Sequence, residues 1–368
     1  MIVDNNNDDN CENQQKLNDA AKDDDSLVLV KSNFKMKIVW RNVIIMSIIH
    51  VFAIYGFIWT KAKLMTFFWT WLMVLLSAFG VLAGAHRLWS HRSYKARWPL
   101  RLLLMIGQTI ALQNDIYEWC RDHRVHHKYS DTDADPHNSR RGFFFSHMGW
   151  LLCRKHPDVI AKGSTIDMSD VWADPIVRFQ RRFYIPLVLL LWGIFPVWIP
   201  IYFWQEDLLV SLSINMLRYV MSLHHAWLVN SAAHYYGYRY YDRQIRPREN
   251  IFVTYLTYGE GYHNYHHVFP WDYSASEYGW NQCFNVTTAL IDFCATIGLA
   301  YDRRIVTKSI IQDRIDRTGE KIIDGYDENN NNNNGEQKRK PESVIIDTII
   351  GFLLVSWPFI LKICFFNV

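Results

Sequence analysis

Long apolar runs limit how this chain can fold more than any other feature of its sequence. Four of them cover about residues 38–59, 65–85, 183–203 and 208–230, and each carries few charged side chains. Runs of about twenty apolar residues are long enough to cross the hydrocarbon core of a bilayer as helices. We therefore expect four transmembrane helices, which form two hairpins with very short links.

The polar segments between the runs indicate the topology. Residues 86–182 and 233–319 are polar and each follows a hairpin, so both are expected on one side of the membrane. Residues 100–112 are apolar but too short to span, which favours a buried or re-entrant helix. Basic residues are frequent in 86–182, whereas the links carry little besides Lys61 and Lys63. By the positive-inside rule, we expect the two polar segments to form a cytosolic helical cap.

Both ends of the chain differ in composition from its main domain, residues 34–320. Residues 1–33 are rich in Asn, Asp and Lys, show no signal peptide and are expected to be disordered. Residues 321–343 contain an asparagine run and have the composition of a low-complexity linker. Residues 344–368 are apolar with two lone charges. A fifth span, a tail anchor and an interfacial helix all remain open for this last segment.

Composition argues against several classes of protein. The net charge is only +3, with no dominant stripe of arginine and lysine, so nucleic acid is not an expected partner. None of the six cysteines forms a CxxC pair, which argues against a zinc ribbon or a disulfide scaffold.

Nine of the fifteen histidines gather in three short boxes and one outlier, beside the apolar runs. On a helix, residues three and four apart share a face, so the histidines of the second box project together, as do those of the third. The first-box pair is five residues apart and converges only if a helix end or a local irregularity lies between its members. The nine are His86, His91, His123, His126, His127, His234, His263, His266 and His267.

These histidines predict a metal site. Neutral imidazole is a common ligand of iron, zinc and copper, and nine ligands exceed the needs of one ion. A zinc hydrolase needs about three protein ligands and a general base. A metal transporter places its ligands near the midplane of its spans, where His50 is the lone candidate. Two redox-active irons that bind oxygen fit the pattern better.

The motifs around the histidines are similar to those of membrane acyl-CoA Δ9 desaturases of the stearoyl-CoA desaturase type. The resemblance covers roughly residues 35–318. It implies an all-α integral membrane protein with four transmembrane helices, a possible fifth at the C-terminus, and a cytosolic helical cap that holds a di-iron site. The motifs that carry it are Ala83-Gly-Ala-His-Arg-Leu-Trp-Ser-His91, Asn114-Asp-Ile-Tyr-Glu-Trp119, Asp135-Pro-His-Asn-Ser-Arg-Arg-Gly-Phe-Phe-Phe-Ser-His147, Asn230-Ser-Ala-Ala-His234 and Gly259-Glu-Gly-Tyr-His-Asn-Tyr-His-His267.

The resemblance also implies roles for single residues. The nine histidines would bind two Fe²⁺ ions, Asn230 would approach one metal through water, and no catalytic residue beyond the metal ligands is expected. The substrate would be a saturated acyl-CoA such as palmitoyl-CoA or stearoyl-CoA, which gains a cis double bond between carbons nine and ten. From sequence we expect the closed end of the acyl tunnel near Thr70 to Ser77, where side-chain size decides what fits. The substrate contacts implied by the family are Asn114, Trp119, Arg121, Asp122, Trp150, Arg154, Lys155 and Trp227.

Electrons for such a reaction would come from outside the chain. His156-Pro157 is followed by Asp158 rather than by the glycines of a haem motif, and no GxGxxG fingerprint appears. The family implies cytochrome b5 with its NADH-dependent reductase, and a multi-pass location in the endoplasmic reticulum membrane with the boxes facing the cytosol. A di-iron fatty acid or sterol hydroxylase and a histidine-rich metal transporter are the alternatives.

Overall fold

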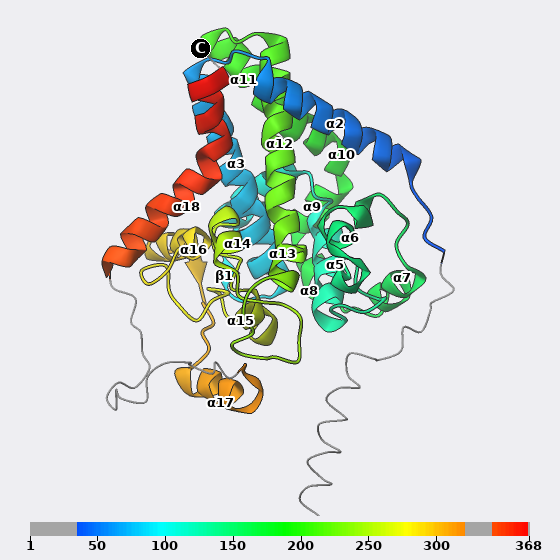
Figure 1. Cartoon of the computed structure of the whole chain (residues 1–368), viewed down its shortest axis with the longest axis vertical. Coiled ribbons are helices and arrows are strands. Elements are labelled where there is room, and N and C mark those ends of the chain that lie inside the picture. The colour runs from blue at the N-terminus through cyan, green and yellow to red at the C-terminus, as the bar shows by residue number, and fades with distance from the viewer. Residues whose placement is uncertain (1–34, 321–340, 367–368) are drawn as a thin grey trace, which may run out of the picture. The chain divides into compact units, whose positions relative to one another are not determined.

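The first helical hairpin lies where the first two apolar runs predict it. The computed structural model describes residues 35–320 and 341–366, and nearly all of its elements are helices (Figure 1). Helix α2 (Trp40–Ile58) is followed by α3 (Leu64–Phe79), which continues directly into a π-helix, η2 (Gly80–Ser90). The second helix therefore extends past the predicted end at residue 85 and carries the first histidine of the site.

The second hairpin also follows the predicted runs. Its first arm is continuous through α10 (Tyr184–Val188), the π-helix η5 (Leu189–Ile194) and α11 (Phe195–Trp204). Its second arm is α12 (Leu208–Asn230), which begins at Asp207 because that side chain accepts hydrogen bonds from the first free backbone amides of the helix.

The membrane spans differ from the prediction in one respect. Among the described residues, four helices are long and apolar enough to cross a membrane: 40–58, 64–90, 184–204 and 345–365. Helix α12 has 23 residues but is not among them, because polar residues such as Arg218 lower its hydropathy. It lies in the middle of the bundle against α2, α3 and α11, so its polar side chains meet protein rather than lipid (Figure 1). The chain is a multi-pass membrane protein.

Residues 100–112 lie mostly in a helix with one buried face and an apolar face that is exposed at Leu102 and Leu103. Helix α4 (Trp98–Ala111) packs across α3 and η2. The crossing is close because both helices have glycine there: a Cβ on Gly80 would lie 2.0 Å from the Gln108 amide nitrogen, and one on Gly107 would lie 2.2 Å from the Leu76 carbonyl. The π-helix that carries the first box is thereby held against the cap.

The cap is built from short helices and one small antiparallel strand pair, in which Lys95 pairs with Tyr301 and Ala96 with Ala300. This pair is a minor exception to the predicted all-α fold. The remaining cap elements are α5 (Ile116–Lys128), η3 (Ser139–Arg141), α6 (Phe143–His147), η4 (Gly149–Leu151), α7 (Pro157–Gly163), α8 (Ser169–Ala173), α9 (Pro175–Arg182), α13 (Ala232–Tyr235), α14 (Ile251–Leu256), α15 (His263–Val268), α16 (Val286–Thr296), α17 (Lys308–Thr318), β1 (Lys95–Ala96) and β2 (Ala300–Tyr301).

The apolar C-terminal segment is helical. Helix α18 (Pro341–Leu361) is followed by a π-helical turn, η6 (Lys362–Phe366), and contacts α14 of the cap. The structure thus favours a span for the described part of this segment over an interfacial helix, because residues 345–365 form a helix long and apolar enough to cross. The expected tail 1–33 and most of the expected linker 321–343 lie outside the described residues.

Candidate metal centre and substrate cavity

All nine predicted histidines come together in the cap, in two groups. Within each group the nitrogens available to a metal lie within 4.8 Å of one another. The first group contains His86, His91, His123, His127 and His266, and the second contains His126, His234, His263 and His267.

The π-helix η2 brings the first box into this arrangement. The His91 amide donates to the His86 carbonyl at 3.1 Å, and the Ser90 hydroxyl donates to the Ala85 carbonyl at 2.7 Å. These contacts run between residues five apart, so side chains at that spacing lie on one face of a π-helix. The His86 and His91 rings are 4.9 Å apart, which shows that a local irregularity joins the pair, as the sequence required.

Two short helices divide their histidines between both groups. On α5, His123 and His127 turn to the first group and His126 turns to the second. On α15, His266 belongs to the first group, whereas His263 and His267 belong to the second. Helix α5 starts at Asp115, whose carboxylate accepts the Glu118 amide at 3.0 Å and so fixes where the helix begins. The two groups are therefore parts of one site.

The ring nitrogens are placed as neighbouring ligands of a common ion would be. The Nε2–Nε2 distance is 2.8 Å for His91 and His123, 2.9 Å for His86 and His266, and 3.1 Å for His234 and His263. Metal–imidazole bonds are about 2.1 Å, so two ligands at a right angle are roughly 3.0 Å apart. The residues present fit two metal ions.

Three carboxylates lie next to histidine Nδ1 atoms that face away from the two groups. His126 Nδ1 lies 2.9 Å from Asp135 Oδ1, His234 Nδ1 lies 3.2 Å from Asp131 Oδ2, and His86 Nδ1 lies 3.1 Å from Glu260 Oε2. The two aspartate contacts are hydrogen bonds, which fix the tautomer and leave Nε2 free for a metal, whereas Glu260 lies at ion-pair distance from His86. The sequence alone did not identify these three residues as partners of the histidines. Their signal is that ligating histidines need carboxylate partners and that acidic residues lie directly beside the second and third boxes.

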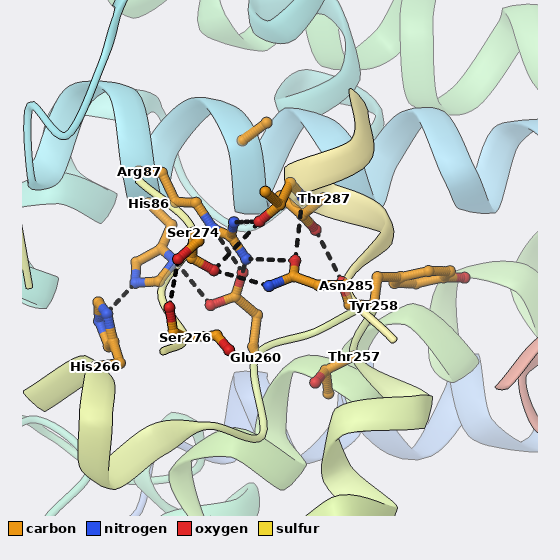
Figure 2. A network of polar contacts seen from close by, with 12 residues as sticks. His86, Arg87, Thr257, Tyr258, Glu260, His266, Ser274, Ser276, Asn285 and Thr287 are labelled. Carbon is orange, nitrogen blue, oxygen red and sulfur yellow. Dashed lines mark hydrogen bonds and ion pairs between the residues drawn. The ribbon is translucent and has the colours of Figure 1, made fainter. Parts of the chain in front are cut away.

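A buried ion pair anchors Glu260 (Figure 2). Arg87 is 1% exposed, and its Nη2 donates to Glu260 Oε1 at 2.7 Å while its Nη1 donates to Thr288 Oγ1 at 2.8 Å. Burial alone would raise the pKa of Glu260, but the Arg87 guanidinium and His86 hold it well below its usual range. Asn285 belongs to the same network and donates to the Ser274 carbonyl at 2.8 Å. The network ties η2 to the loop before α15.

Burial keeps most of the site neutral. Burial, reinforced by the neighbouring histidines, lowers the pKa of His123, His127, His263 and His266 well below the usual value. Neutral imidazole is the form that binds metals. His126 differs: burial opposes its charge, but the Asp135 carboxylate outweighs burial and raises its pKa.

An apolar cavity lies between α3, η2, α12 and the loop before α15, and one of its wall residues leads to the first group of histidines. Its empty volume is about 410 Å³. Gln113 lines it and accepts a hydrogen bond from Trp119 Nε1 at 3.4 Å, and the Trp119 ring stacks on His123 with centroids 4.9 Å apart. Val74 and Ser77 also line it, both within the stretch in which the sequence analysis placed the closed end. The cavity is lined mostly by apolar side chains, and Gln113 and Trp119 connect its wall to His123.

Three of the residues expected to contact the substrate line a second, more polar pocket, whose empty volume is about 650 Å³. They are Arg121, Asp122 and Lys155, and Asp122 contacts both cations, with Arg121 Nη2 at 3.1 Å from its Oδ1. Arg154 is exposed and is not among the residues that line this pocket.

The other expected substrate residues are spread around the site. Trp227 is buried against the rings of His147 and His224, and Trp150 packs edge-on against His137 at 4.4 Å. Asn114 is exposed, and its carbonyl accepts from Gln108 Nε2 at 2.6 Å. Asn230 is half-buried at the end of α12, and its side chain forms no direct hydrogen bond within the described part of the chain.

Fold and site together define a class: a multi-pass membrane protein whose histidine-only metal site lies beside an apolar cavity. A family model for fatty acid desaturases matches residues 63–304. The chain is 58% identical to the stearoyl-CoA desaturases of Bos taurus and Sus scrofa over 289 residues, which cover 78% of this chain and 80% of each relative. It is 57% identical to the stearoyl-CoA desaturase of Homo sapiens over 288 residues, with the same coverage. The chain belongs to the fatty acid desaturase family and is an oxidoreductase.

Proposed function

We propose that the chain is an acyl-CoA Δ9 desaturase. It uses O₂ to insert a cis double bond between carbons nine and ten of palmitoyl-CoA or stearoyl-CoA, for the biosynthesis of unsaturated fatty acids. The observation that carries the proposal is the apolar cavity beside two converging groups of histidines. The names of the relatives support the substrate class.

The nine histidines would hold two iron ions, five imidazoles in one group and four in the other. Asn230 would complete the second group through water. The ring-nitrogen distances, the neutral imidazoles and the three supporting carboxylates all support this assignment. Bound iron would supply the redox chemistry that O₂ needs to remove hydrogen from an acyl chain.

The protein's own residues would bind and orient the substrate. The cavity wall would hold the acyl chain in one conformation and exclude water, which is catalysis by positioning. Arg121 and Lys155 would receive the anionic CoA head, because guanidinium and ammonium groups pair with phosphate. Trp119 would border the reacting carbons, since its ring lies directly on His123.

Two electrons for each turnover would come from cytochrome b5 and its NADH-dependent reductase. We place the chain in the endoplasmic reticulum membrane with the cap in the cytosol, because the basic residues of the segment 86–182 lie on the side of the histidines.

The proposal is tested by expressing the chain in a cell that lacks its own desaturase and identifying the fatty acids by mass spectrometry after derivatisation. We expect cis Δ9 monounsaturated acids. An alcohol product would assign the chain to the hydroxylases, and metal flux into liposomes without any lipid product would assign it to the transporters. A double bond at another position would remove the Δ9 assignment and leave the desaturase assignment standing.

A further inference from the structure

Helix α18 has one face against the protein and one face that is exposed and apolar. Gly351, Val355 and Phe359 are buried, at a spacing of four residues that places them on one face. Leu353 and Trp357 on the other face are 54% and 48% exposed. An exposed apolar stripe on a helix of 21 residues indicates contact with lipid along the whole span.

The two lone charges of the segment are both engaged by other parts of the chain. The Tyr255 hydroxyl, next to the cap, donates to Asp347 Oδ1 at 2.9 Å. At the other end, Lys362 is fully buried and donates to the Thr60 carbonyl in the link between α2 and α3. Helix α18 therefore runs from the cap to the far ends of the first hairpin.

The buried face of α18 belongs to the same packed cluster as the cavity wall. Val355 and Phe359 share an apolar cluster with Val74 and Tyr258, and these last two residues line the cavity. Only one layer of side chains thus separates α18 from the space in which an acyl chain would lie.

Tyr258 is the bulkiest side chain of that layer and is held in an unusual way. Its φ is +57°, which is rare for a large side chain, and the following Gly259 has a φ of +115°. Its side chain is 2% exposed, and its hydroxyl has no hydrogen-bond partner among the described residues. The ring points away from His86 and Glu260 (Figure 2). Strained backbone together with an unpaired buried polar group is typical of functional positions.

Two of the α3 residues that line the same cavity are small. Ser77 and Ala78 fill little of its volume, so Tyr258 is the largest side chain in its wall. Val81 and Leu82, further along the same helix, precede His86 closely, so this part of the cavity lies beside the metal centre. Methylenes beyond the reacting carbons must then extend towards Val74 and Tyr258.

We propose that Tyr258, backed by Val355 and Phe359 of α18, closes the acyl cavity and sets the longest chain that the enzyme accepts. This inference rests on the proposed function. It adds a specificity-determining residue and gives the C-terminal helix, which lies outside the region matched by the family model, a part in substrate choice.

The test is competition between palmitoyl-, stearoyl- and icosanoyl-CoA for the purified iron-loaded enzyme. Tyr258→Ala should raise the kcat/KM ratio of icosanoyl-CoA to stearoyl-CoA by about tenfold, because a small wall admits added methylenes. Tyr258→Phe, which keeps the ring, should leave the ratio unchanged. An unaltered ratio in Tyr258→Ala would overturn the inference.

A matched pair of variants tests α18. Val355→Ala on the protein face should shift the ratio in the same direction by a smaller factor, and Leu353→Ala on the lipid face should not. Equal ratios in the two variants would remove α18 from the wall.

Ala78→Leu fills the cavity from the α3 side and should favour palmitoyl-CoA, which gives a result even if Tyr258→Ala fails to fold. A wild type that desaturates no acyl-CoA would refute the proposed function itself. If the wild type is active but neither Tyr258→Ala nor Ala78→Leu changes the ratio, the proposed function stands. Only the inference about the cavity wall would then be refuted.

Discussion

In three of the histidines, Nδ1 faces a carboxylate and Nε2 faces the metal group. The contact at Nδ1 affects how strongly Nε2 can bind a metal. His126 shows this most clearly, because Asp135 both fixes its tautomer and raises its pKa while its Nε2 faces the second group. A carboxylate behind an imidazole increases its basicity and therefore its strength as a ligand. The second group consequently depends on Asp135 as well as on its four histidines.

Replacing His126 with Ala should lower bound iron well below two ions per chain and abolish desaturation, since a lost ligand disrupts the geometry of its group. Iron measured by mass spectrometry on protein from membranes checks the number. His224→Ala is the matched control, because His224 contacts His50 and His147 and belongs to neither group. Normal turnover and full iron in His126→Ala would contradict the assignment.

Glu249 should make the fold less stable as pH rises. Desolvation raises the pKa of its carboxyl group to about 8, and Oε1 accepts the Tyr265 amide at 2.8 Å. The unfolded carboxyl has a pKa of about 4.3, so the folded state binds the extra proton between these values and stability falls across that range. The thermal midpoint of Glu249→Gln should therefore fall less than that of the wild type between pH 5.5 and pH 8. Parallel curves would show that Glu249 does not titrate in this way.

At the level of residues, the sequence located the nine histidines because their spacing follows helical periodicity. It did not reveal Asp131 or Glu260 as partners, because those contacts join segments far apart in the chain. The sequence also did not distinguish the positions of Lys155 and Arg154, because they are adjacent and carry the same charge. In the structure Lys155 lines the pocket and Arg154 is exposed.

Among the elements, the crossing of α4 over α3 and η2 depends most on single residues. Gly107→Ala places a methyl group against the Leu76 carbonyl and should destabilise the fold by about 1–3 kcal/mol, as overpacking does. Gly193→Ala in η5 is the control, because a Cβ there meets no atom within 4 Å. Thermal midpoints in one detergent check both variants, and equal midpoints would show that the crossing can relax.

The elements were predictable to different degrees. Hydropathy located both arms of each hairpin, and the length of α4 indicated a helix that does not span, without deciding between a buried and a re-entrant one. The π-helix was predicted only as a helix end or a local irregularity between His86 and His91. Sequence composition does not show whether backbone hydrogen bonds join residues four or five apart. Arg218 lowers the hydropathy of α12, although this helix lies inside the bundle. In the structure Arg218 donates to Asn215 and does not meet lipid.

For the whole molecule, the membrane topology can be tested at the C-terminus. A glycosylation site fused after Val368 should be modified in microsomes, because α18 would carry it across to the side opposite the cap. The natural sequon at Asn285 should stay unmodified, because the proposed topology puts this residue in the cytosol. A mobility shift on glycosidase treatment that is lost in Asn285→Gln would show that the cap lies on the side opposite to the one proposed.

Long-range charge should affect substrate binding through Lys155. Lys155→Ala should raise KM for acyl-CoA severalfold and weaken its dependence on salt, because a screened attraction to phosphate is removed. Arg154→Ala, its exposed neighbour, should change both properties less. The position of the double bond should be the same in both variants, and equal KM values would remove Lys155 from the head-group site.

Because α5 and α15 each supply histidines to both groups, the distance between the two groups of ligands is fixed by the rise of these helices. Loading one ion would hold both helices in place and so arrange the remaining ligands for its neighbour. Metal uptake would then be cooperative, and a centre with one ion would be a short-lived state.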